Sequence, residues 1–174
     1  RFSEYIICGE LSINGEVKPI RGALPIALGF SKTNTTCIIL PVENVKEAGI
    51  VKEIDVYPAG SLKELADFLS GQIELKPQKV NTDRLFKQNS KYRVDFADVK
   101  GQEHVKRGLE IAAAGGHNIL LIGPPGSGKS MLAKRLPTIL SDMSIDESLE
   151  TTRIHSVAGL LSPKKGLIAT RPFR

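Results

Sequence analysis

The feature that most constrains this chain is the loop Gly123-Pro-Pro-Gly-Ser-Gly-Lys129-Ser130, which matches the pattern GxxxxGK[ST]. The apolar run 119–122 before it predicts a strand, and the helix-like segment after it begins near Gly128. Glycines let successive backbone N–H groups converge on phosphate oxygens, and a helix N-terminus adds partial positive charge. Lysine here reaches the β- and γ-phosphates, and the next hydroxyl ligates Mg²⁺. The predicted ligands of ATP are Gly123, Pro124, Pro125, Gly126, Ser127, Gly128, Lys129 and Ser130, with Ser130 also the metal ligand.

Hydrolysis of ATP needs more than this loop, because a carboxylate on a following strand must hold Mg²⁺ and an arginine is usually required. The acidic residues after Ser130 all fall in the polar stretch 141–150, which we interpret as a solvated acidic turn. We therefore expect nucleotide binding without the hydrolytic half of the site, and no catalytic residue. The residues without a predicted catalytic role are Asp142, Asp146, Glu147, Glu150, Arg153, Arg171 and Arg174.

Length and composition limit the classes of protein. The 174 residues suffice for one ordinary domain or two small ones. No segment approaches the ~18 apolar residues of a membrane span, and the chain starts without Met or a signal peptide. We expect a cytosolic protein, cut from a longer one, with no membrane partner.

Cysteine and histidine give no metal or redox pattern. Cys8 and Cys37 lie in strand-like runs without CxxC spacing, which predicts buried, reduced thiols. His104, His117 and His155 show no ligand spacing, and we assign them to a helix, a loop and a strand.

The net charge of +5 is unevenly distributed along the chain. Residues 1–77 hold eight Lys/Arg against ten Asp/Glu, whereas residues 78–174 hold sixteen against nine. The second part is therefore expected to meet nucleotide, nucleic acid or both, although a solvated basic surface would give the same balance.

Local patterns predict the remaining elements. Asn14-Gly15 indicates a hairpin with a type I′ turn, and Ser61 with Glu64 forms a capping box. Gly115-Gly116 ends a helix whose apolar face holds Val105, Leu109, Ala112 and Ala113. The predicted segments are strands within 4–20, a helix over 22–32, a strand over 36–40, a helical turn over 43–49, a strand over 54–57, a helix over 61–69 and a linker over 76–93.

Longer stretches resemble a known family. Residues 94–140, 153–161 and 171–174 resemble the magnesium-chelatase-like AAA+ ATPases of the bacterial ComM/YifB group. Residues 8–28 and 38–44 are similar to the Lon-type proteolytic domain that this group carries ahead of its ATPase module. The resemblance implies an α/β fold class: a partial Lon-protease-like α+β domain over 1–75, the linker 76–93, and an incomplete P-loop AAA+ α/β domain over 94–174.

The resemblance also carries site residues. In AAA+ proteins the segment like Asp98–Gln102 lies beside the nucleotide base, which implies Val99 and Gly101 as base-side residues. The alternative is a plain helix N-cap at Asp98. The family pattern further implies that the Mg²⁺-holding carboxylate, a sensor residue and a trans-acting arginine lie beyond the end of this chain, and that the full-length protein forms a homo-hexamer.

A protease activity is rejected at the level of residues. Lon-type proteases use a serine–lysine pair, in which lysine acts as the general base. Aligning the helix start on 19–28 places Leu24 at the lysine position, and neither Ala23 nor Pro25 is a lysine. The serine would lie before residue 1. Leucine cannot accept a proton, so we expect a non-proteolytic domain.

Three functions remain. The first is an AAA+ motor on DNA, since the ComM-like group is associated with competence, branch migration and other DNA processing. The second is a chelatase-type motor that remodels a protein partner during metal insertion, although such subunits generally lack the Lon-like domain. The third is a nucleotide-dependent interaction module.

Overall fold

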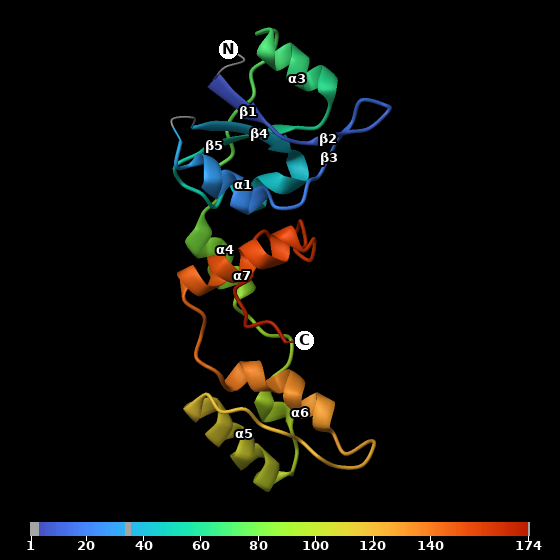
Figure 1. Ribbon diagram of the computed structural model, residues 1–174, viewed down its shortest axis with the longest axis vertical. Coiled ribbons are helices and arrows are strands. Elements are labelled where there is room, and N and C mark those ends of the chain that lie inside the picture. The colour runs from blue at the N-terminus through green and yellow to red at the C-terminus, as the bar shows by residue number, and fades with distance from the viewer. Residues whose placement is uncertain (1–3, 34–35, 174) are drawn as a thin grey trace.

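The computed structural model describes residues 4–33 and 36–173. One end of the molecule is a sheet with helices, the other end holds α5 and α6, and α4 and α7 lie between them (Figure 1). The elements are β1 (Tyr5–Ile7), β2 (Glu10–Leu11), β3 (Val17–Lys18), α1 (Ala23–Phe30), β4 (Cys37–Pro41), η2 (Val42–Asn44), α2 (Val45–Ala48), β5 (Asp55–Ala59), α3 (Leu62–Leu69), α4 (Thr82–Asn89), η3 (Phe96–Asp98), α5 (Glu103–Gly115), α6 (Lys129–Arg135), η4 (Leu136–Ile139) and α7 (Ile145–Val157).

The main sheet is parallel, in the order β1-β4-β5, which confirms the α/β class. Side chains alternate across the central strand β4, as the period of two requires. Ile38 and Leu40 point into a cluster with α1 and α2, whereas Ile39 points to the other face. There it packs with Phe68 of α3. Both faces of the sheet are therefore covered by helices.

The predicted hairpin is present, but its turn differs from the prediction. Strands β2 and β3 pair antiparallel, with the Gly15 N–H bonded to the Ser12 carbonyl at 2.9 Å. Gly15 has φ 82°, while Asn14 is not in the left-handed region, so a type I′ turn is excluded. The first predicted strand is also divided, because β1 pairs in the main sheet and β2 in the hairpin.

Most predicted helices begin and end near their signals. Ser61 caps α3 by accepting the Glu64 N–H at 3.2 Å, although the Glu64 carboxylate accepts from the Gly60 N–H instead of closing the box. Gly116 ends α5 with φ 62°. The segment 76–93, expected to be a linker, contains the helix α4.

Helix α7 corrects the interpretation of residues 141–150 as a solvated turn. Ser144 and Glu147 form a capping box, and the helix continues through His155, which is therefore not a strand residue. The buried face of α7 consists of small hydroxyl side chains at a spacing of four. These are Ser148, Thr152 and Ser156.

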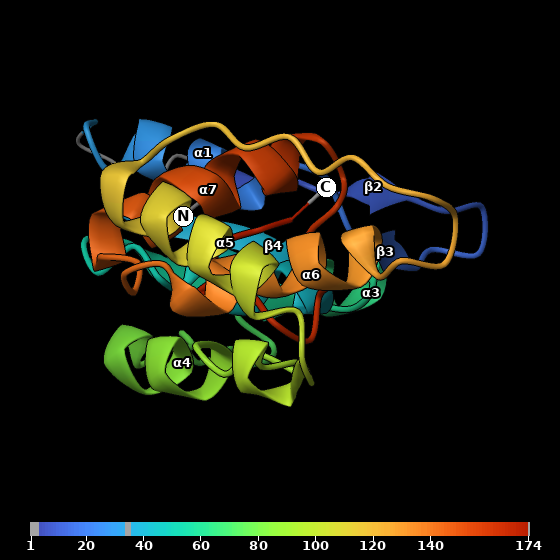
Figure 2. The same cartoon turned by 90° about the horizontal axis from the view of Figure 1, so that it is seen from below.

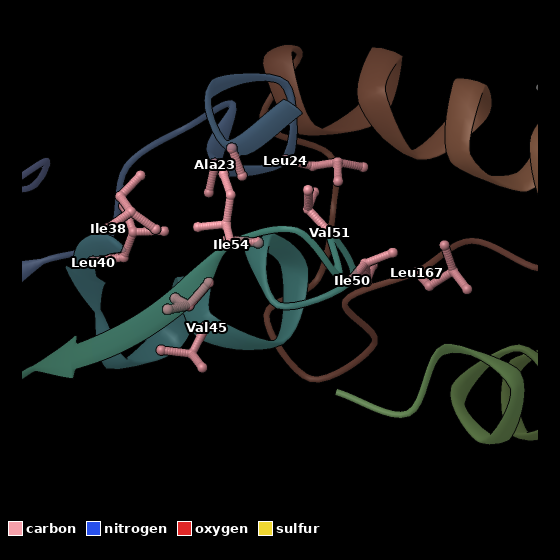
Figure 3. Close-up of a cluster of buried hydrophobic side chains, with 12 residues drawn as sticks. Ala23, Leu24, Ile38, Leu40, Val45, Ile50, Val51, Ile54 and Leu167 are labelled. Atoms are coloured by element: carbon pink, nitrogen blue, oxygen red, sulfur yellow. The ribbon is translucent and has the colours of Figure 1, made fainter. Parts of the chain in front are cut away.

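We call the main sheet with its covering helices α1, α2 and α3 the sheet unit. Its core includes residues from far along the chain. Leu167 is fully buried in the cluster that also holds Leu24 and Ile38 (Figure 3). Leu149 of α7 packs against the same cluster. Helix α7 lies beside α1 in both ribbon views (Figures 1 and 2). The segment from α7 to Leu167 thus packs on the sheet unit.

The strand predicted over 119–122 does not form. A strand needs a neighbouring strand to pair its backbone N–H and C=O groups. In the part of the chain that the structure describes, the main sheet consists of β1, β4 and β5, and 119–122 pairs with none of them. Leu121 packs in the cluster of α5 and α6, but Leu120 and Ile122 are 80% and 86% exposed. The segment therefore has no regular secondary structure.

Candidate functional site

The glycine-rich loop curls through two left-handed residues. Gly126 has φ 80° and Gly128 has φ 84°, a region that glycine enters without the Cβ clash of other residues. A Cβ on Gly126 would meet no atom within 4 Å, so the loop is open at this point. A Cβ on Gly123 would lie 3.1 Å from the Ser127 hydroxyl, which shows how closely these two residues approach within the loop.

The ammonium group of Lys129 lies inside this curl. Its Nζ donates to the carbonyl oxygens of Gly123 and Pro124, at 2.7 Å each, and to Ser127 Oγ at 3.1 Å. The first turn of α6 thus delivers a cation to the concave side of the loop. Ser130, the next residue, is exposed on the same turn. The predicted loop residues are therefore brought together around one charge.

A small apolar cluster supports the loop from behind. Leu132 of α6 and Leu109 of α5 are buried against Phe96 and Val99. Because Val99 as a whole residue is 3% exposed, it is closed to a ligand in this structure. Gly101 has φ 64° and open space at its Cβ position. Of the two residues that the resemblance implies beside the base, Gly101 is thus accessible to a ligand and Val99 is not.

Gln102 was not predicted as a site residue, but it contacts the loop directly. Its Nε2 donates to the Ser127 carbonyl at 3.4 Å, and it caps α5 with φ 57°. Among the described residues other than glycine, it alone has a positive φ. Asp98 is therefore not the N-cap of α5; it belongs to a capping box with Asp95 one turn earlier. No sequence pattern signals this arrangement, because glutamine is not a preferred cap.

Arg135 fastens the segment before α5 to the end of α6. Its Nε donates to the Asp95 carbonyl at 3.0 Å, and its NH2 lies 3.8 Å from Asp98 Oδ2. The Phe96 N–H donates to the Thr138 hydroxyl at 3.0 Å. These bonds hold the residues around Val99 at a fixed position relative to the loop.

The acidic residues after Ser130 are arranged around α7 instead of the loop. Glu147 accepts from the Ser144 N–H at 2.8 Å and lies 3.3 Å from Arg171, which also donates to the Ser141 carbonyl at 2.8 Å. The hydrogen bond from the Ser144 N–H is the main cause that holds the pKa of Glu147 below its ordinary value of 4.5; desolvation opposes it, and the hydrogen bond and charge of Arg171 lower the pKa further. Asp146 and Glu150 are exposed on the same helix. Arg171, which had no predicted role, thus fixes the start of α7.

The remaining reactive side chains give no further centre. Cys8 and Cys37 are free and half-buried, less enclosed than expected, and burial raises the pKa of Cys8. Across residues 4–33 and 36–173, no three His, Cys, Asp or Glu side chains gather into a group suited to a metal ion. Leu24, at the lysine position of the Lon-type alignment, is fully buried.

Comparison with known proteins identifies the family. Residues 95–174 match the family model "Magnesium chelatase, subunit ChlI", and residues 1–44 match "Subunit ChlI of Mg-chelatase". YifB of Escherichia coli is 40% identical over 174 residues, covering 100% of this chain and 33% of YifB. Competence protein ComM of Haemophilus influenzae is 36% identical over 155 residues, covering 88% of this chain and 30% of ComM.

A shorter match concerns a protease. An archaeal Lon protease of Archaeoglobus fulgidus is 39% identical over 51 residues, covering 29% of this chain and 8% of that protein. The chain spans about a third of the length of the YifB and ComM relatives. No helix within the described ranges has both the length and the apolar character to cross a bilayer. From the two family models and the matches over most of its length, the chain belongs to the magnesium-chelatase-like proteins of the ComM and YifB type.

Proposed function

We propose that the loop 123–130 is a P-loop that binds ATP with Mg²⁺. The observation that carries this proposal is the position of Lys129, whose ammonium lies on the concave side of a glycine-rich curl, within 2.7 Å of two of its carbonyl oxygens. A triphosphate offers this ammonium stronger, charge-assisted bonds than neutral carbonyls do. The backbone N–H groups around Gly126 supply the other donors.

The residues present suit the magnesium ion that accompanies ATP. Ser130 is exposed beside Lys129, and Mg²⁺ prefers oxygen ligands and keeps several waters. When bound, the ion neutralises charge on the phosphates. Lys129 would orient the nucleotide at its phosphates, and the segment of Val99 and Gly101, in which Gly101 is the exposed residue, would lie beside the base.

For the whole protein we propose an ATP-driven AAA+ motor that acts on DNA, assembled as a homo-hexamer in the cytoplasm. A relative is named a competence protein, and residues 78–174 carry sixteen Lys/Arg against nine Asp/Glu. Residues 1–75 would form a Lon-like domain without protease activity, supported by the short match to the archaeal Lon protease and by the buried Leu24. A chelatase-type motor shares the ATPase segment, but the Lon-like domain counts against it.

The hydrolytic half of the site is proposed to come from outside residues 1–174. Asp146, Glu147 and Glu150 lie on α7, which packs beside α1, and Glu147 is bonded to Ser144 and Arg171. Glu147 is committed to the start of α7, Asp146 and Glu150 are exposed, and among the described residues none of the three forms an ion pair with Lys129. Residues 1–174 alone should therefore bind ATP and show negligible turnover.

A nucleotide titration tests the binding proposal. A fluorescent ATP analogue with Mg²⁺ should bind residues 1–174, and Lys129→Ala should weaken binding by roughly 10- to 100-fold or more, since hydrogen bonds to charged groups contribute about 1.5–3 kcal/mol. Lys134→Ala, which removes an exposed cation from the same helix, is the matched control and should change little. Retained affinity in Lys129→Ala, or no binding of the unmodified chain at millimolar analogue, would overturn the assignment.

A further inference from the structure

The positive charge of this chain is concentrated around α4. Residues 76–93 hold six Lys/Arg and one Asp, a net of +5 in eighteen residues. Residues 1–75 have a net charge of −3 and residues 94–174 of +3, so the rest of the chain is balanced. The asymmetry of the sequence therefore originates largely in the segment between the two units.

Helix α4 is held firmly against the sheet unit. Leu85 and Phe86 pack against the main cluster, as does Val80 just before the helix. The Asn89 side chain donates to the carbonyl oxygens of Lys165 and Leu167, at 2.9 and 2.8 Å. The helix thus has one fixed, apolar side, and its other side forms an edge of the molecule (Figure 2).

The outer side of α4 is a row of cations. Arg84 and Lys87 are three residues apart on the same helix face, a spacing at which Cβ atoms are generally about 5–6 Å apart, and Lys91 follows the last turn. All three are exposed and line one shallow hollow together with Asn81, Asp83 and Gln88. In the part of the chain that the structure describes, none of these three cations forms an ion pair, whereas Lys79 pairs with Asp55 at 3.5 Å. We call Arg84, Lys87 and Lys91 the α4 basic row.

We propose that the α4 basic row binds the phosphate backbone of DNA, outside the nucleotide loop. This inference rests on the proposed DNA-directed function and adds the surface that would hold the DNA. Its contacts would be sequence-independent, because lysine and arginine on phosphates carry no base information. The row would anchor the duplex between the sheet unit and the part of the molecule that holds α5, α6 and the loop 123–130.

The chemistry of the row favours a nucleic acid over an acidic protein. Protein interfaces centre on aromatic and apolar side chains, whereas surfaces for DNA are more polar and far more positively charged. On α4 the large apolar residues Leu85 and Phe86 face the core, and the hollow is lined by polar and charged side chains only. Such a surface attracts a polyanion mainly through counterion release.

The test uses the full-length protein and a fluorescein-labelled duplex, with anisotropy measured over a range of salt concentrations. We compare the triple variant Arg84→Gln/Lys87→Gln/Lys91→Gln with the matched control Lys18→Gln/Lys52→Gln/Lys63→Gln, which removes the same charge from exposed sites on the sheet unit. The slope of log K against log[salt] should fall in magnitude by about 2–3 in the first variant, at roughly 0.9 for each phosphate contact. The control slope and the ATP affinity of both variants should be unchanged.

The outcomes separate this inference from the proposed function. If the unmodified protein does not bind the duplex at low salt, both fail. If it binds and the triple variant keeps its slope, or if the control loses as much, the α4 assignment alone fails. If the triple variant loses binding of a labelled polyglutamate peptide but keeps duplex binding, the row serves an acidic protein and the proposal is overturned.

Discussion

The hydroxyl of Ser156 donates a hydrogen bond to the carboxylate of Glu47, which lies 109 residues earlier in the chain. The same carboxylate oxygen accepts the backbone N–H of Leu24 at 2.8 Å, and both Glu47 and Ser156 are buried. One side chain of α2 therefore joins α1 to α7. Because a buried donor without an acceptor is costly, this bond fixes how α7 sits on the sheet unit.

Removing the shared acceptor should destabilise the protein more than removing the donor. Glu47→Leu leaves two buried donors unpaired and should lower the unfolding free energy by about 2–4 kcal/mol, whereas Ser156→Ala should lower it by about 1 kcal/mol. Urea denaturation measures both. Glu43→Leu, at an exposed position four residues earlier, is the control and should stay within about 0.5 kcal/mol. Equal effects at positions 43 and 47 would show that the buried carboxylate does not hold α7.

Any side chain at Gly126 should strain the backbone of the loop. With φ 80°, Gly126→Ala forces a left-handed alanine and should lower the unfolding free energy by about 1 kcal/mol as well as weaken binding of the ATP analogue. Gly29→Ala is the matched control, because Gly29 is exposed in α1 with an ordinary φ and open space at its Cβ. It should stabilise the protein by about 0.5–1 kcal/mol. A stabilising Gly126→Ala would contradict the loop conformation.

Glu147 should make the stability of α7 depend on pH. Its pKa is below the ordinary value of 4.5 in the folded protein, so its contribution is present above pH 4.5 and is lost as pH falls through the folded pKa. The melting temperature of the wild type should therefore exceed that of Glu147→Gln at neutral pH, and the difference should shrink on acidification. Glu150→Gln, at an exposed position on the same helix, provides the comparison. A difference that grows below pH 4.5 would have the wrong sign.

Leu167 should matter to the sheet unit despite its position in the sequence. Its side chain is fully buried, so Leu167→Ala should cost about 2–5 kcal/mol. Amides of β4 and β5 should then exchange faster with deuterium. Leu160→Ala, at a residue 50% exposed, should cost much less. Unchanged protection of β4 and β5 in Leu167→Ala would mean that the sheet core closes without this side chain.

Local signals in the sequence were sufficient for much of the fold. The caps and turn glycines at Ser61, Gly15 and Gly116 mark real boundaries, and GxxxxGK[ST] correctly located the loop and the helix that follows it. These predictions succeed because each depends on residues within a few positions of one another. They hold whatever the remainder of the chain does.

The errors come from a weak local pattern at α7 and, elsewhere, from information that is not local. Helix α7 was missed because its buried face is Ser148, Thr152 and Ser156, so apolar periodicity is weak; the S-x-x-E signal from Ser144 to Glu147 was available and could have located its start. The strand at 119–122 was expected from composition, but strand formation depends on a partner backbone. The contacts of Gln102 and Arg171 with distant carbonyl oxygens have no counterpart in any sequence motif.

The burial of Leu167 in the sheet core has a consequence for biosynthesis. The other buried members of that cluster end at Val56. The ribosome must therefore translate 111 further residues before Leu167, the last buried member, is added. At roughly 5–20 residues per second, this interval lasts about 5–20 s. During that time the nascent sheet leaves the ribosome with an apolar gap in its interior, a state that chaperones are suited to recognise.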